Sequence, residues 1–76
     1  EPGHRGRQAI EDCKIQFRER IVQLTRDMKA REPEALADGL LLLIEGAYSS
    51  HQIFGSQGPG QSLVRSADAL IECYRT

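Results

Sequence analysis

The residues best suited to chemistry are His51 and the two serines directly before it, Ser49 and Ser50. A serine activated by a histidine is the nucleophile of many hydrolases. However, adjacent residues on a helix do not face each other, no carboxylate lies nearby to orient His51, and no oxyanion-hole turn follows. We therefore predict that the chain is not an enzyme. His51 is expected to be a polar residue at the edge of a pocket or an interface.

Metal and cofactor sites are also not predicted. The cysteines and histidines lack the short spacings of metal ligands. These residues are Cys13, Cys73, His4 and His51. The glycine-rich segment 55–60, GSQGPG, lacks the Gly-Lys-Ser/Thr ending of a phosphate-binding loop. Two cysteines are too few for a disulfide scaffold, and two reduced thiols suit a cytoplasmic protein.

Charge is unevenly distributed along the 76 residues, although the net charge is only −1. Residues 1–31 hold eight basic and five acidic side chains, whereas residues 32–76 hold two basic and six acidic ones. Acids are interleaved with the bases of the first segment, so we expect a solvated helix face rather than a phosphate-binding one. No apolar run approaches the ~18–20 residues of a membrane span, and no membrane partner is predicted.

The hydropathy pattern predicts an all-α chain of three helices. Residues 1–8, rich in glycine, proline and charge, are expected to form a flexible segment before a single domain, 9–76. The first helix is predicted over residues 9–31, with an apolar stripe at spacings of three and four. The stripe consists of Ile10, Cys13, Phe17, Ile21, Leu24 and Met28. Helices over 33–54 and 62–74 follow, with Pro33 in the first turn, Gly55 as a C-terminal cap and Ser62 as an N-terminal cap.

The central helix is apolar over two faces. One is a core stripe of Leu36, Leu40, Leu43, Ala47 and Phe54. A neighbouring face carries Ala35, Gly39, Leu42, Gly46 and Ile53, with Ser49 at its flank. The solvent-facing side of this helix is predicted to consist of Glu34, Asp38, Leu41, Glu45, Tyr48 and Gln52. Glycines inside a helix cost up to ~1 kcal/mol each against alanine, which makes sense where another backbone comes close.

Two interpretations of these glycines remain open. They could line a tight helix crossing within the chain, or they could face a second copy of the same helix. The surplus of apolar surface favours the second copy, because large exposed apolar patches mark interaction sites. The predicted dimer interface is Ala35, Gly39, Leu42, Gly46, Ser49, Ile53, Val64 and Ile71. A second set could form a ligand-pocket wall or plain core: Phe17, Ile21, Leu43, Ala47 and His51.

The stretch EPEALADGLLLLIEGAYSSHQIFG, with the following SLVRSADALIECYRT, resembles the C-terminal part of TetR-type transcriptional repressors. The resemblance is carried by the acidic-proline start at Pro33 and Glu34, the apolar block Leu40 to Ile44, and the Gly46-Ala47 step. Residues 13–32 are similar to the helix that commonly precedes these two in that family. The similarity extends over residues 9–75.

This resemblance implies a homodimer whose four-helix-bundle interface comes from the last two helices of each subunit. It also implies a small-molecule inducer site in the C-terminal domain, and DNA binding only through an N-terminal helix-turn-helix that these 76 residues lack. The function expected is that of a ligand-responsive dimerisation domain of a repressor. The alternative is a stand-alone helical homodimeric adaptor with no role at DNA. Residues upstream of Glu1 would separate the two hypotheses.

Overall fold

The computed structural model describes residues 2–75 of the chain, with side chains from Gly6 onward. Three helices follow one another: α1 (Pro2–Asp27), α2 (Pro33–Phe54) and α3 (Leu63–Cys73). Two short 3-10 turns, η1 (Gly55–Gln57) and η2 (Pro59–Ser62), join α2 to α3. No strand occurs in residues 2–75, so the chain is all-α over the part described.

Helix α1 differs from the prediction at both ends. It begins at Pro2, within the segment 1–8 that was expected to be a flexible loop, and it ends at Asp27 rather than near residue 31. Proline at the start is compatible with a helix, because the first-turn N–H groups have no partner within the helix. At the other end, Lys29 and Glu32 take positive φ angles of 59° and 43°, which no helix continues through. The connection to α2 is therefore a tight left-handed turn.

The second and third helices lie close to their predicted bounds. Gly55 ends α2 with a φ of 67°, and its N–H donates to the carbonyl of His51. Glycine adopts this conformation without the steric cost that a Cβ would bring. Ser62 precedes α3, but its hydroxyl makes no capping hydrogen bond, so the expected side-chain cap is wrong. The preceding 3-10 turn continues directly into α3 and leaves Ser62 without the extended backbone that an N-cap normally has.

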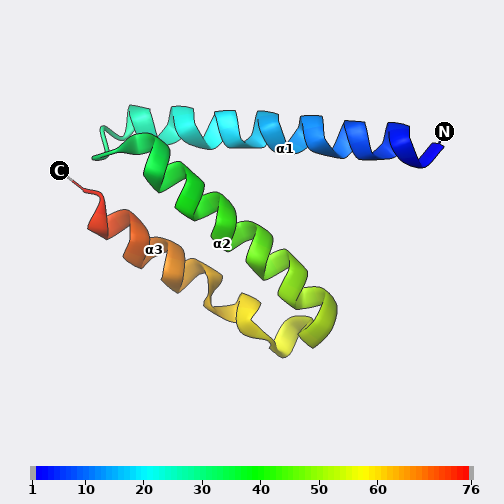
Figure 1. The fold of residues 1–76 in the computed structure, drawn as a ribbon. Coiled ribbons are helices and arrows are strands. Elements are labelled where there is room, and N and C mark those ends of the chain that lie inside the picture. Colours follow the sequence, from blue (N-terminus) through cyan, green and yellow to red (C-terminus); the bar gives the residue numbers. More distant parts are fainter. Residues whose placement is uncertain (1, 76) are drawn as a thin grey trace.

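The three helices form a single layer, with α2 between α1 and α3 (Figure 1). No Cα atom of α1 comes within 8 Å of a Cα atom of α3. The Cα atoms extend over 47 × 29 × 12 Å, and their radius of gyration is 14.4 Å. A compact chain of this length would have a radius of gyration of about 11 Å. The layer is therefore flat and leaves both of its broad sides uncovered.

Helices α1 and α2 are joined by three ion pairs. Lys14 Nζ lies 2.8 Å from Glu45 Oε1, Arg18 Nε lies 2.6 Å from Asp38 Oδ1, and Arg26 Nη2 lies 3.5 Å from Glu34 Oε1. The antiparallel order of these pairs fixes the register of the two helices. The predicted solvent-facing side of α2 is correct for Glu34, Tyr48 and Gln52, which are exposed, whereas Asp38, Leu41 and Glu45 are partly buried near α1. The uneven charge along the sequence has its origin in these ion pairs.

The buried core is small and lies where α1 meets the first turns of α2. Ile21, Val22, Leu36 and Ala37 are the hydrophobic residues buried there, together with the hydroxyl-bearing Thr25. The Thr25 hydroxyl lies 2.9 Å from the Val22 carbonyl oxygen and 2.8 Å from that of Pro33, so it links the two helices. The predicted apolar stripe of α1 is buried only at Ile21. Its other members remain exposed because α2 crosses α1 beside the stripe rather than over it.

Candidate functional site

One broad side of the layer, here the glycine side, presents α2 residues Ala35, Leu42, Gly46 and Ile53. At about 100° per residue these four positions share one face of the helix. Leu42 is 70% exposed and Ile53 is 78% exposed. A Cβ built at Gly46 would meet no atom within 4 Å, so this glycine faces open space. The glycine side therefore combines two unpartnered large side chains with a flat, backbone-lined centre.

Gly39, which the sequence pattern placed on the same face, has a different environment. A Cβ at this position would lie 2.7 Å from Leu70 Cδ2 of α3. Gly39 thus permits the close crossing of α2 and α3 within one chain, which was one of the two interpretations for the pair of glycines. Gly46 has no such neighbour. The two glycines therefore do not serve one common contact inside the described chain.

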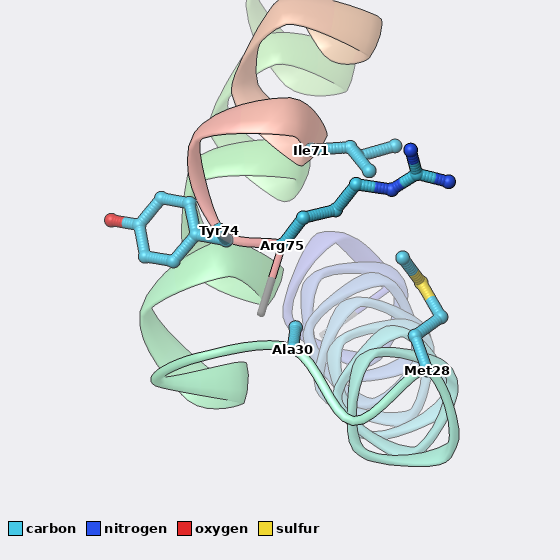
Figure 2. A pocket seen from close by; sticks show the side chains of 5 residues that line it. All are labelled: Met28, Ala30, Ile71, Tyr74 and Arg75. Atoms are coloured by element: carbon cyan, nitrogen blue, oxygen red, sulfur yellow. The ribbon is translucent and has the colours of Figure 1, made fainter.

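The predicted interface residues of α3, Val64 and Ile71, lie on the other broad side of the layer. Ile71 lines a hollow of about 400 Å³ together with Met28, Ala30, Tyr74 and Arg75. Figure 2 shows the side chains of Met28, Ile71 and Arg75 on one side of this hollow, whereas the Tyr74 ring points away. Val64 is seven positions before Ile71 and therefore shares its face of α3.

A groove opens where α1 and α2 diverge, and its lining reaches from Phe17 and Ile44 on this second side to Glu45 and Ser49 nearer the glycine side. It has a volume of about 460 Å³. Its lining consists of Cys13, Lys14, Phe17, Leu41, Ile44, Glu45, Tyr48 and Ser49. Phe17 and Leu24 share one face of α1, and Met28, in the turn after α1, continues that face. These three residues connect the groove to the hollow around Ile71. We call the surface of Phe17, Leu24, Met28, Ile44, Val64 and Ile71 the groove side.

The two sides face in nearly opposite directions. Ile44 lies about 160° around α2 from Leu42, and Ala69 and Cys73 lie about 160° around α3 from Ile71. Ala69 and Cys73 are consequently the α3 residues that accompany Leu42 on the glycine side. The eight predicted interface residues are thus divided between two surfaces, and Ser49 lies at the rim of the groove between α1 and α2. The helical periodicity of α2 could not predict this division, because it depends on the rotation of α3 about its axis relative to α2.

The residues predicted as a pocket wall are not brought together. Phe17 lines the α1–α2 groove, whereas Ile21 is part of the buried core. Ala47 lies beside Gly60, where a Cβ would come 3.6 Å from the Ala47 carbonyl oxygen. His51 is exposed near the end of α2, and Leu43 is partly buried. The groove is mostly lined by other residues, notably Ile44 and Tyr48, which were not in the predicted set.

The charges next to the groove are paired within the chain. Arg18 donates to both carboxylate oxygens of Asp38, at 2.6 and 3.2 Å. This hydrogen bonding holds the pKa of Asp38 below its ordinary value of 3.8, although partial desolvation acts in the opposite direction. The same pair raises the pKa of Arg18, and the hydrogen bond from Lys14 to Glu45 raises the pKa of Lys14 above 10.5. Lys14, Arg18 and Asp38 therefore stay charged around neutral pH, and their ion pairs between α1 and α2 are present there.

Neither metal chemistry nor a membrane span has a basis in the described residues. Within them, no three His, Cys, Asp or Glu side chains gather as ligands for a metal ion. None of the helices described has both the length and the apolar content needed to cross a bilayer. Both cysteines carry free thiols that are exposed.

Comparison with known proteins gives no relative: no family model matches the chain, and neither does any curated protein or solved structure. The similarity to TetR-type repressors therefore remains a prediction from the residues themselves.

Proposed function

We propose that this chain is a homodimerisation domain and that a second copy covers its glycine side. The observation that carries the proposal is the single-layer fold. A helical domain buries its apolar stripes by packing one layer of helices on another. Here the described residues provide one layer only, and its few buried hydrophobic side chains lie at one end.

The glycine side suits a two-fold contact between identical helices. Gly46 lies near the middle of α2, between Leu42 and Ile53, so two copies of α2 can cross there with their backbones close together. In a two-fold contact the same surface patch of each copy packs against its equivalent on the other copy. The Leu42 and Ile53 side chains of each copy would then pack on either side of the crossing. Ala69 and Cys73 of α3 would extend the contact with small side chains.

In its finer form, the proposal is that this domain dimerises and regulates a TetR-like repressor. The support for this step is the sequence resemblance in α2 and α3, together with their antiparallel hairpin arrangement. A ligand bound near the core would then bias two dimer arrangements and change the spacing of two DNA-binding domains. The alternative, a helical adaptor that dimerises without any role at DNA, has the same support from the fold.

The dimer is tested by measuring the solution mass of the wild-type chain and of Leu42→Asp and Gly46→Leu. We expect the wild-type mass to be at least twice the 8.5 kDa of one chain. Each substitution should weaken association by about 100-fold, because it buries an unpaired charge or separates the crossing helices. The matched control, Gln52→Asp, changes an exposed residue of α2 outside the glycine side.

A wild-type chain that stays monomeric at high micromolar concentration would contradict the proposal, as would a mass that neither substitution changes. The repressor and the adaptor are separated by the residues encoded upstream of Glu1. A helix-turn-helix pattern there supports the repressor, and a start codon immediately before Glu1 supports the adaptor.

A further inference from the structure

More large hydrophobic side chains are exposed on the groove side than on the glycine side. Phe17 is 42% exposed, Leu24 is 61% exposed and Val64 is 70% exposed. Ile10, which lies one heptad before Phe17 on the same face of α1, is also exposed. A dimer formed through the glycine side would leave all of this surface in water. Apolar patches of this extent on a soluble chain are usually covered by a partner.

We propose that a second copy of this chain also packs on the groove side, so that two dimers join into a tetramer. The first argument is the charge of this surface. A two-fold contact places the same surface patch of each copy against the other, so an excess of unpaired charge of one sign on that patch would oppose it. The charged residues that line the groove, Lys14 and Glu45, are paired with each other. At the hollow around Ile71, Arg75 is paired with Glu72 at 3.0 Å.

The second argument is the shape of the two helices. Figure 1 shows α1 and α2 diverging from the turn that connects them, so that the first half of α1 projects away from α2. On this projecting half, Ile10 forms an apolar ridge that continues along the same face of α1 to Phe17, which lines the groove together with Ile44 and Tyr48. In a two-fold arrangement the ridge of each copy can enter the groove of the other. Ridges packed into grooves are the usual way in which helices associate.

The third argument is area. A stable pairwise contact buries about 800 Å² on each partner. The accessible surface of the chain is 6057 Å², so two contacts of that size would take up about a quarter of it. Tetramers with two kinds of two-fold contact are common among symmetric oligomers. The groove contact stands independently of the glycine side, but the tetramer as a whole rests on the dimer proposed above.

The test is the solution mass of four forms of the chain, measured by analytical ultracentrifugation from low to high micromolar concentration. The wild type should reach four copies at high concentration. Both Phe17→Asp/Leu24→Asp and Leu42→Asp/Ile53→Asp should stop at two copies. The fourfold variant should remain a single chain. Gln16→Asp/Gln52→Asp serves as the matched control and should behave as the wild type, and circular dichroism establishes that each variant remains helical.

The outcomes separate the two contacts. A wild-type dimer that Phe17→Asp/Leu24→Asp leaves intact overturns the groove contact and leaves the glycine side standing. A wild-type dimer that only Phe17→Asp/Leu24→Asp dissociates overturns the glycine side and leaves the groove contact standing. If the groove variants lose helicity, the wild-type Cys13 thiol gives a second measurement. Its alkylation should slow several-fold as concentration rises, and a constant rate overturns the groove contact.

Discussion

Gly39 and Leu70 are in such close contact that a Cβ on Gly39 would lie 2.7 Å from Leu70 Cδ2. This contact sets the distance between α2 and α3. Gly39→Ala would have to displace the end of the Leu70 side chain, and this displacement offsets part of the ~1 kcal/mol that alanine gains over glycine in a helix. We expect the offset to disappear in a Leu70→Ala background, where alanine at position 39 gains its full helix propensity.

A double-mutant cycle measured by urea unfolding tests this coupling, which should be about 0.5 kcal/mol. Gly46→Ala is the matched control, because nothing within 4 Å opposes a Cβ at that position. In a Leu70→Ala background Gly46→Ala should show no coupling. Equal effects of Gly39→Ala with and without Leu70 would mean that the crossing is looser than the structure shows.

Thr25 should matter more for stability than its type suggests. It is 1% exposed, and its hydroxyl lies within hydrogen-bonding distance of the carbonyls of Val22 and Pro33. Thr25→Val keeps the shape of the side chain but removes the donor, and it should lower the free energy of unfolding by about 1–2 kcal/mol. Thr25→Ser keeps the hydroxyl, so it should keep the hydrogen bond to the Pro33 carbonyl and lose only the packing of one methyl group. Chemical denaturation of both variants checks the prediction, which fails if valine is tolerated better than serine.

The pair Arg18–Asp38 predicts a defined pH dependence. Because the folded chain lowers the pKa of Asp38 below 3.8, the ionised carboxylate favours the folded state. This contribution is fully present above the unfolded pKa, and it is lost as the pH falls through the lower folded value. Stability should therefore decline below about pH 4. The decline should be smaller in Asp38→Asn, which has no carboxyl group to protonate.

Carbon-13 NMR of the Asp38 carboxyl group gives the direct measurement. Its midpoint should lie below 3.8 in the wild type and move up toward 3.8 in Arg18→Gln. Gln23→Leu is a suitable control, because it removes a different side-chain hydrogen bond of α1, the one to Asp27. A wild-type midpoint at or above 3.8 would contradict the pairing.

Thermal stability should depend on protein concentration. Few hydrophobic residues of the described chain are buried, and if a second copy covers the glycine side as proposed, part of the free energy of unfolding comes from contacts between copies. We expect the midpoint of unfolding to rise as the concentration is increased, and to rise less in Leu42→Asp. A midpoint that is the same across a hundredfold range of concentration would show that one copy is stable alone. Circular dichroism and calorimetry together span the necessary range.

The sequence was sufficient to predict the secondary structure of α2 and α3, because their ends carry strong signals. Pro33 and the glycine-proline segment after Phe54 stop helices for local steric reasons that do not depend on the rest of the fold. The start of α1 was missed for the opposite reason. Glycine and proline near residue 3 weaken a helix without forbidding it.

The arrangement of side chains between the helices was harder to predict. A helical wheel identifies apolar faces but does not say which neighbour covers them. Leu41 and Glu45 were expected to face water, yet both face α1. Glu45 pairs there with Lys14, and Leu41 packs against the small buried core. Pairing of opposite charges across two helices leaves no periodic apolar signal. The net charges of +3 over residues 1–31 and −4 over residues 32–76 were the one available indication, and interleaved acids obscured it.

Arg31, which lies just before α2, is hydrogen-bonded to the end of α3. Its main-chain N–H donates to the Tyr74 carbonyl at 2.8 Å, and its guanidinium donates to the Cys73 carbonyl at 2.6 Å. The hairpin of α2 and α3 is thereby tethered at its open end as well as at its turn, whereas among the described side chains of α1 the first with an ion pair to the hairpin is Lys14. We therefore expect the α2–α3 hairpin to be rigid and the N-terminal part of α1 to move relative to it. Any contact that restrains this part of α1 would then set its angle to the hairpin.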